Sequence, residues 1–129
     1  LTGASLALFV VEPTTSGRHD FIRVAQLAAQ LGVPGIMTVN KADVNEALAQ
    51  ELEDYARLHE IDVAGRVPYD PAVTRAQINR ETVVEASDGP AAQAIRVLWK
   101  AVKKRLEHCA PASVGDLAQL ASRKQGLET

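Results

Sequence analysis

Segments of this chain alternate between two hydrophobic patterns, short apolar runs and helical spacing. Apolar runs occupy residues 6–11 and 35–39, and a third segment at 63–67 begins and ends on valine. Short apolar runs bounded by glycine, proline or polar residues are typical of strands buried on both faces of a parallel sheet. The pattern therefore predicts about three parallel strands.

The segments between these strands have helical spacing instead. One predicted helix opens at Ser16-Gly17, stops at Gly32, and has an apolar face formed by Phe21, Val24, Ala25, Ala28 and Leu31. The next is capped by Asn45, with Glu53 on its polar side and an apolar stripe of Leu48, Leu52, Tyr55 and Leu58. Strand-helix-strand units in series predict right-handed crossovers and an α/β layered sheet with flanking helices.

The second half of the chain predicts mostly helix. A short helix is expected at 74–78, a brief apolar element at 83–84, and a long helix from Asp88-Gly89-Pro90 onward. The long helix is expected to bury Ile95, Leu98, Trp99, Val102 and Leu106. Residues 1–108 are thus interpreted as one α/β region, and residues 109–129 as a helical or flexible C-terminal tail.

Composition narrows the class of protein. The 129 residues are 47% hydrophobic and 23% charged with a net charge of −2, which argues against disorder and gives no overall basic field for nucleic acid. The single cysteine, Cys109, excludes an intrachain disulfide and fits a reducing cytoplasm. The three histidines show no metal-ligand spacing, and no apolar run is long enough to span a bilayer. We expect a cytoplasmic protein with no metal site, nucleic-acid partner or membrane span.

The candidate chemistry begins at Asn40-Lys41-Ala42-Asp43, directly after the second apolar run. An amide and a carboxylate can read the edge of a nucleotide base while the lysine stem packs along the ring. Neither G-x-x-x-x-G-K-[ST] nor G-x-G-x-x-G occurs among the eight glycines, so no phosphate-binding loop accompanies this motif. These residues alone predict base recognition without phosphoryl transfer and without catalytic residues.

Each candidate residue also has a structural interpretation. Asn40 and Asp43 could cap the helix that follows, because both residue types favour helix N-termini. Asp20 and Arg23, at i and i+3, could form a surface ion pair. Residues 68–71, Pro-Tyr-Asp-Pro, could be a turn and nothing more.

Taken in order, several segments resemble the C-terminal half of the MinD/ParA/Mrp superfamily of deviant Walker P-loop ATPases. The matching segments are 12–14, 16–24, 40–43, 65–70 and 88–91. They are most similar to the branch that carries an inserted ferredoxin-type iron–sulfur module. The resemblance implies part of a P-loop NTPase-like layered fold, with the P-loop, the switch segments and the cluster cysteines upstream of Leu1.

The resemblance also implies roles for particular residues. Asn40 would contact the adenine edge, and Pro68, Tyr69 and Asp70 would line the adenine pocket, whereas Asp43 would matter most for guanine. Asp20 and Arg23 would lie near an ATP-dependent dimer contact. The intact parent would be a homodimer that uses ATP and Mg²⁺, with an iron–sulfur or other protein partner. Any 4Fe-4S ligands would come from outside this chain.

Three hypotheses follow. The first is the base-side, adenine-recognising portion of a MinD/Mrp-like ATPase that is inactive by itself. The second is a non-catalytic α/β interaction module that self-associates through an exposed sheet edge. The third is a guanine-reading GTPase fragment, because the sequence alone leaves adenine and guanine open.

Overall fold

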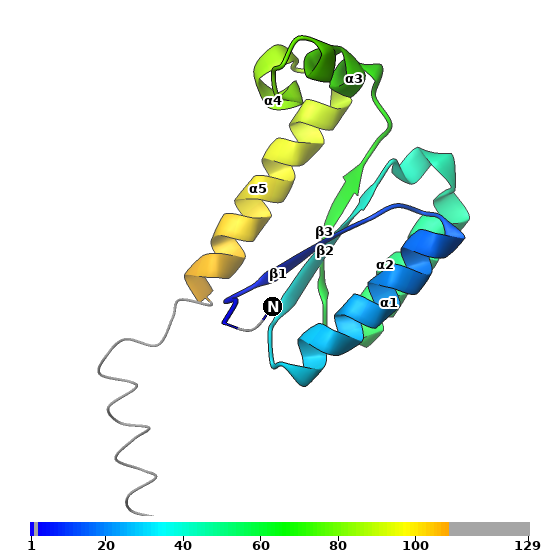
Figure 1. Cartoon of the computed structure of the whole chain (residues 1–129), viewed down its shortest axis with the longest axis vertical. Helices are drawn as coiled ribbons and strands as arrows, with labels where there is room; N and C mark the ends of the chain where they lie inside the picture. Colours follow the sequence, from blue (N-terminus) through cyan, green and yellow to red (C-terminus); the bar gives the residue numbers. More distant parts are fainter. Residues whose placement is uncertain (2, 109–129) are drawn as a thin grey trace, which may run out of the picture.

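The computed structural model describes Leu1 and residues 3–108, and within this part strands alternate with helices as far as the third strand, after which only helices follow (Figure 1). Residues 109–129, with Cys109, lie outside the described residues, so the division of the chain at residue 108 stays a prediction. The elements are β1 (Ala7–Val11), α1 (Thr15–Gln30), β2 (Gly35–Asn40), the 3-10 turn η1 (Ala42–Val44), α2 (Glu46–Leu58), β3 (Asp62–Val67), α3 (Pro71–Ile78), α4 (Val83–Ala86) and α5 (Pro90–His108).

The three strands form one parallel sheet in the order β1-β2-β3. Helices α1 and α2 lie together on one face, whereas α5 lies on the other face and packs against β3 (Figure 1). Helices α3 and α4 form a small cap at one end of α5 (Figure 1). This arrangement confirms the predicted α/β class and the partial parallel sheet with flanking helices.

The main core lies between the sheet and the α1–α2 layer. The rings of Phe9 and Phe21 meet edge to face with centroids 5.5 Å apart, and Phe21 meets Tyr55 in the same way at 5.7 Å. Met37 and Val39 of β2 are fully buried in this cluster. A second, smaller core of Ala72, Ala76, Val83 and Ala92 joins α3, α4 and α5.

The prediction that the first strand is buried on both faces is wrong. Leu8 is 43% exposed and Val10 is 59% exposed, while Ala7, Phe9 and Val11 between them are buried. The reason is geometric: β1 is an outer strand of the described sheet, and α5 covers β3 rather than β1. One apolar face of β1 therefore lies open.

Several helix positions also differ from the predicted faces. Val24, Leu31, Leu58, Trp99 and Leu106 were expected to be inside but are exposed. Glu53 was expected on the polar side but is only 6% exposed. Its Oε1 accepts a hydrogen bond of 2.6 Å from Arg66 Nε, which compensates for burial of the carboxylate.

Helix starts are set by side-chain caps that lie slightly upstream of the predicted positions. Thr14 accepts a hydrogen bond from Gly17 N, so α1 begins at Thr15. Asp70 accepts one from Ala72 N, so α3 begins at Pro71 rather than at residue 74. The predicted cap at Asn45 is confirmed by its 3.0 Å bond from Leu48 N.

A local irregularity in β3 sets the register at the far end of the sheet. The pairing of β2 with β3 shifts between Met37 and Val39, and the buried Thr38 hydroxyl donates a 2.9 Å hydrogen bond to the Gly65 carbonyl. Gly65 has a φ of +117°, a conformation that is strained for residues with a side chain. After this shift Asn40 pairs with Val67, which brings the last residues of the two strands side by side.

Candidate functional site

A pocket of about 360 Å³ lies where β2 and β3 end. Its walls come from both strand ends and from α3, α4 and α5, through Asn40, Lys41, Val67, Pro68, Tyr69, Asp70, Val73, Thr74, Gln77, Val83 and Ile95. The carboxyl ends of parallel strands are where open α/β sheets bind ligands. Four of the five residues predicted to bind the nucleotide line this one pocket: Asn40, Pro68, Tyr69 and Asp70. Their roles in binding stay predictions.

Asn40 is the last residue of β2 and is half-buried at the rim of the pocket. Its Oδ1 accepts a hydrogen bond of 3.1 Å from the backbone N–H of Lys41. An asparagine amide also carries an NH₂ group with two donors. Neither Asn40 nor Asp43 caps α2, because Asn45 does.

Asp43 does not line the pocket but supports its wall. The carboxylate projects from η1, and Oδ1 accepts a 2.8 Å hydrogen bond from the backbone N–H of Tyr69. This bond joins the turn after β2 to the loop after β3. One oxygen of the aspartate is therefore engaged with the protein itself.

Lys41 connects the pocket to β1. It has a left-handed φ of 53°, and its Nζ lies 3.1 Å from Glu12 Oε1, just beyond the end of β1. Both side chains are about half exposed, at 47% and 48%, so the pair contributes little to stability. Its effect is to hold the lysine stem between the ends of two strands.

Asp70 is the wall residue with the most contacts to the backbone. One oxygen accepts from Ala72 N at 2.9 Å and the other from Ala91 N at 3.3 Å. These amides belong to the first turns of α3 and α5, whose partial positive charge favours a carboxylate. The interpretation of residues 68–71 as a local backbone feature is thus correct for Asp70, which caps α3. Tyr69 beside it is 55% exposed.

Asp20 and Arg23 lie elsewhere, on the exposed side of α1. Together with Val24 and Leu27 they line a shallow groove, and neither lines the pocket at the strand ends. Among the described residues, Asp20 Oδ1 lies 3.9 Å from His19 Nδ1, and the ion pair with Arg23 that the sequence offered is not formed. Their role as a dimer or partner surface stays a prediction.

Sequence reasoning missed the walls contributed by the helices. Val73, Thr74 and Gln77 of α3 and Ile95 of α5 line the pocket, as does Val83 of α4. The sequence predicted α3 and α5 as helices and α4 only as a brief apolar element, but not how these segments return over the sheet. The bond from Asp70 to Ala91 N, which fixes that return, has no local sequence signal.

Two kinds of feature, a metal-binding cluster and a membrane-spanning helix, are absent from residues 1 and 3–108. No group of three or more His, Cys, Asp or Glu side chains in this part could hold a metal ion. None of its helices is both long enough and apolar enough to cross a membrane.

Comparisons with known proteins give one kind of match. No family model matches the chain. No curated protein matches it either. Among solved structures, the MinD cell division protein of Aquifex aeolicus superposes with a TM-score of 0.65 at 23% identity, covering 80% of this chain.

The match is partial on the side of the other protein. This chain spans 45% of the length of the Aquifex aeolicus protein. At such low identity the likeness shows a shared fold, and it gives no support to the iron–sulfur branch. The described part of the chain therefore shares its α/β fold with part of that MinD protein.

Proposed function

We propose that this chain forms the adenine side of an ATP site in a MinD-like ATPase and is inactive without the rest of that site. The observation that carries the proposal is the pocket at the ends of β2 and β3, where Asn40, Pro68, Tyr69 and Asp70 converge. Its volume of about 360 Å³ suits a nucleoside base.

The composition of the pocket suits a planar ring with polar edges. Val67, Pro68, Val73 and Ile95 provide apolar walls. Asn40 presents an amide that can both donate and accept along the edge of the base. A few polar groups on an otherwise apolar surface are typical of sites that orient a small molecule.

Adenine is favoured over guanine by the state of Asp43. An aspartate that reads guanine uses its carboxylate to accept from ring N–H donors. Here Oδ1 already accepts from Tyr69 N at 2.8 Å, so the carboxylate is directed into the loop after β3. This contact supports an architectural role for Asp43.

The phosphate side is expected to come from other parts of the parent protein. Phosphoryl transfer requires cations and backbone donors around the phosphates, and this chain has no P-loop motif. The proposal therefore places Mg²⁺ binding, hydrolysis and homodimer formation in an intact cytoplasmic parent. Ligands for any 4Fe-4S cargo of that parent would likewise come from outside this chain.

The test is a titration of the 129-residue chain with adenosine and guanosine, followed through its backbone amide NMR signals. Adenosine is expected to shift the signals of Asn40, Val67 and Tyr69 in a saturable way, and more strongly than guanosine. Asn40→Ala should weaken adenosine binding about tenfold, because it removes the edge contact. Gln30→Ala is the matched control, since it removes an exposed amide at the end of α1.

Two results would contradict the proposal. One is ATP turnover by this chain that is lost in Asn40→Ala. The other is tighter binding of guanosine than of adenosine, which would favour the guanine-reading alternative.

A non-catalytic interaction module is the second candidate, and the open face of β1 supports it. Leu8 and Val10 are exposed there, and β1 pairs on one side only within the described sheet. An outer strand with apolar side chains favours pairing with another chain. Light scattering should then show self-association that Val10→Lys abolishes, and a concentration-independent monomer would exclude this candidate.

A further inference from the structure

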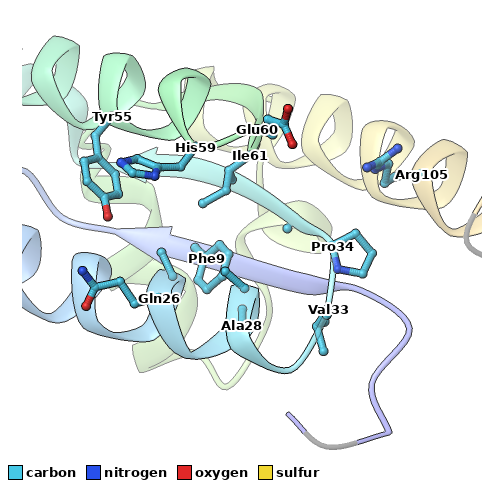
Figure 2. A pocket seen from close by; sticks show the side chains of 14 residues that line it. Phe9, Gln26, Ala28, Val33, Pro34, Tyr55, His59, Glu60, Ile61 and Arg105 are labelled. Carbon is cyan, nitrogen blue, oxygen red and sulfur yellow. The ribbon is translucent and has the colours of Figure 1, made fainter.

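A second cavity of about 410 Å³ lies at the opposite end of the strands from the base pocket. It opens between the turn that joins α1 to β2 and the turn that joins α2 to β3 (Figure 2). No residue of the base pocket lines it. The volume is within the usual range for small-molecule sites.

The floor of this cavity is apolar. Phe9, Ala28 and Ile61 contribute side chains to it, and Gly35 contributes bare backbone. A Cβ added at Gly35 would lie 2.6 Å from Phe9 Cε2, so the phenyl ring lies directly against the glycine. Only glycine therefore fits at this position of the floor without a shift of the ring.

One end of the cavity is aromatic. Tyr55 lies on α2 and His59 directly follows that helix, with their ring centroids 4.2 Å apart and their planes inclined by 36° (Figure 2). Their edges and faces can contact a third ring, which contributes about 0.5–1.5 kcal/mol beyond burial of area in comparable pairs. The wall therefore favours aromatic over aliphatic ligands.

The other end carries a cation. Figure 2 shows Arg105 of α5 across the cavity from Tyr55 and His59. Arg105 Nε lies 3.1 Å from Asp62 Oδ2, yet the geometry makes no hydrogen bond, and this buried atom has no other partner among the described residues. A guanidinium has five donors, so Asp62 leaves most of them available for an anion.

We propose that this cavity binds a small aromatic monocarboxylate. Its ring would lie on the floor beside Tyr55 and His59, and its carboxylate would accept hydrogen bonds from Arg105. Glu60 also lines the cavity, so a ligand with two carboxylates would be repelled more strongly than a ligand with one. This site is independent of the proposed adenine site.

The experiment is an NMR titration of the 129-residue chain with 3-phenylpropanoate, up to about 10 mM, because small ligands of this size bind in the millimolar range. Saturable shifts are expected for the amides of Gln26, Gly32, Gly35 and Ile61. The matched probe 2-phenylethylamine keeps the ring and linker but carries a cation. It should bind at least about tenfold more weakly.

Two pairs of variants test the assignment. Arg105→Gln should weaken 3-phenylpropanoate about tenfold, whereas Lys104→Gln, which removes a charge outside the cavity, should change it less than about twofold. Ala29→Leu places a bulky group at the exposed mouth and should abolish the shifts. Ala47→Leu makes the same change at an exposed position on α2 outside the cavity and should have no effect.

The proposal is overturned by shifts that do not saturate, by equal binding of the amine and the acid, or by unchanged affinity in a folded Arg105→Gln variant. Retained binding in a folded Ala29→Leu variant would place the ligand elsewhere and would overturn it too.

Discussion

Tyr69 donates its backbone N–H to Asp43 Oδ1 at 2.8 Å, across 26 residues of sequence. The bond joins the turn after β2 to the loop after β3 and so connects two sides of the base pocket. Asp43 thereby acts on the pocket without lining it. This relationship gives the aspartate of the N-K-x-D motif a structural role in the wall of the pocket.

Asp43→Ala should lower the free energy of unfolding by about 0.5–1.5 kcal/mol, because it removes this hydrogen bond. Urea unfolding measures the loss, and hydrogen exchange at the Tyr69 amide should become faster. Asp20→Ala is the control, since it removes an exposed carboxylate whose neighbour is His19 at 3.9 Å. Equal losses in the two variants would show that the Asp43 bond contributes nothing specific.

The buried Glu53 makes a second prediction. Arg66→Met should cost about 2–3 kcal/mol, because it leaves the carboxylate with only the longer contact to Arg57 at 3.6 Å. The double variant Glu53→Leu with Arg66→Met should lose less than the single variant, since no buried charge remains. Denaturant unfolding of the three proteins tests this, and a larger loss in the double variant would contradict it.

The contribution of the Glu53–Arg66 ion pair to stability should not change with pH around neutrality. The hydrogen bond from Arg66 to Glu53 raises the pKa of the guanidinium. A cation with a raised pKa contributes stability below its unfolded pKa and loses it only as the pH rises through the folded value. The cost of Arg66→Met should therefore not change between mildly acidic and mildly alkaline solution.

Local sequence signals predicted the elements well because they depend on neighbours in the chain. Asn45 as a cap and Gly32 as a stop are such signals, and both ends were confirmed. Burial depends instead on what covers a face. Leu8 and Trp99 looked internal from periodicity, but no described element lies over them. Glu53 looked external because the sequence does not show that Arg66 lies beside it.

In the candidate site, too, local sequence predicts some residues and leaves the long-range contacts unpredicted. Asn40 and Tyr69 could be named from their motifs, and parallel strand order alone brings strand ends together. The hydrogen bonds that support the pocket walls could not be predicted, because Asp43 reaches Tyr69 and Asp70 reaches Ala91 across more than one element. The cavity around Arg105 had no motif, since its residues come from five separate elements and the turns between them.

The capping box of α4 predicts a pH dependence. Hydrogen bonds from the Thr82 backbone and side chain lower the pKa of Glu85 below its ordinary value of 4.5. A depressed carboxylate pKa contributes stability above the unfolded value, which is lost as the pH falls through the folded value. The stability difference between the wild type and Glu85→Gln should therefore shrink below about pH 4.5. A difference that does not change with pH would contradict the capping role.

Gly17 tests the close approach at the start of α1. A Cβ at this position would lie 2.3 Å from the Glu12 carbonyl oxygen, so backbone must move to accept it. Gly17→Ala should cost about 1–3 kcal/mol, although alanine is otherwise the better helix former. Ser16→Ala, one residue away and exposed, is the control and should be close to neutral. A stabilised Gly17→Ala protein in thermal unfolding would show that the contact is absent in solution.

Arg80 offers a prediction with the opposite sign. It directly follows the C-cap residue of α3 and has a left-handed φ of 58°. The backbone N–H of Glu81 donates a hydrogen bond of 2.9 Å back to the carbonyl of Ala76. Glycine avoids the cost that a side chain adds in this conformation, so Arg80→Gly should stabilise the protein by about 0.5–1 kcal/mol. Arg75→Gly, inside the same helix, should destabilise it by about 1 kcal/mol, because glycine is a poor helix former. Urea unfolding of both variants measures the two signs, and a loss of stability in Arg80→Gly would mean that the arginine side chain makes a contact that outweighs its backbone strain.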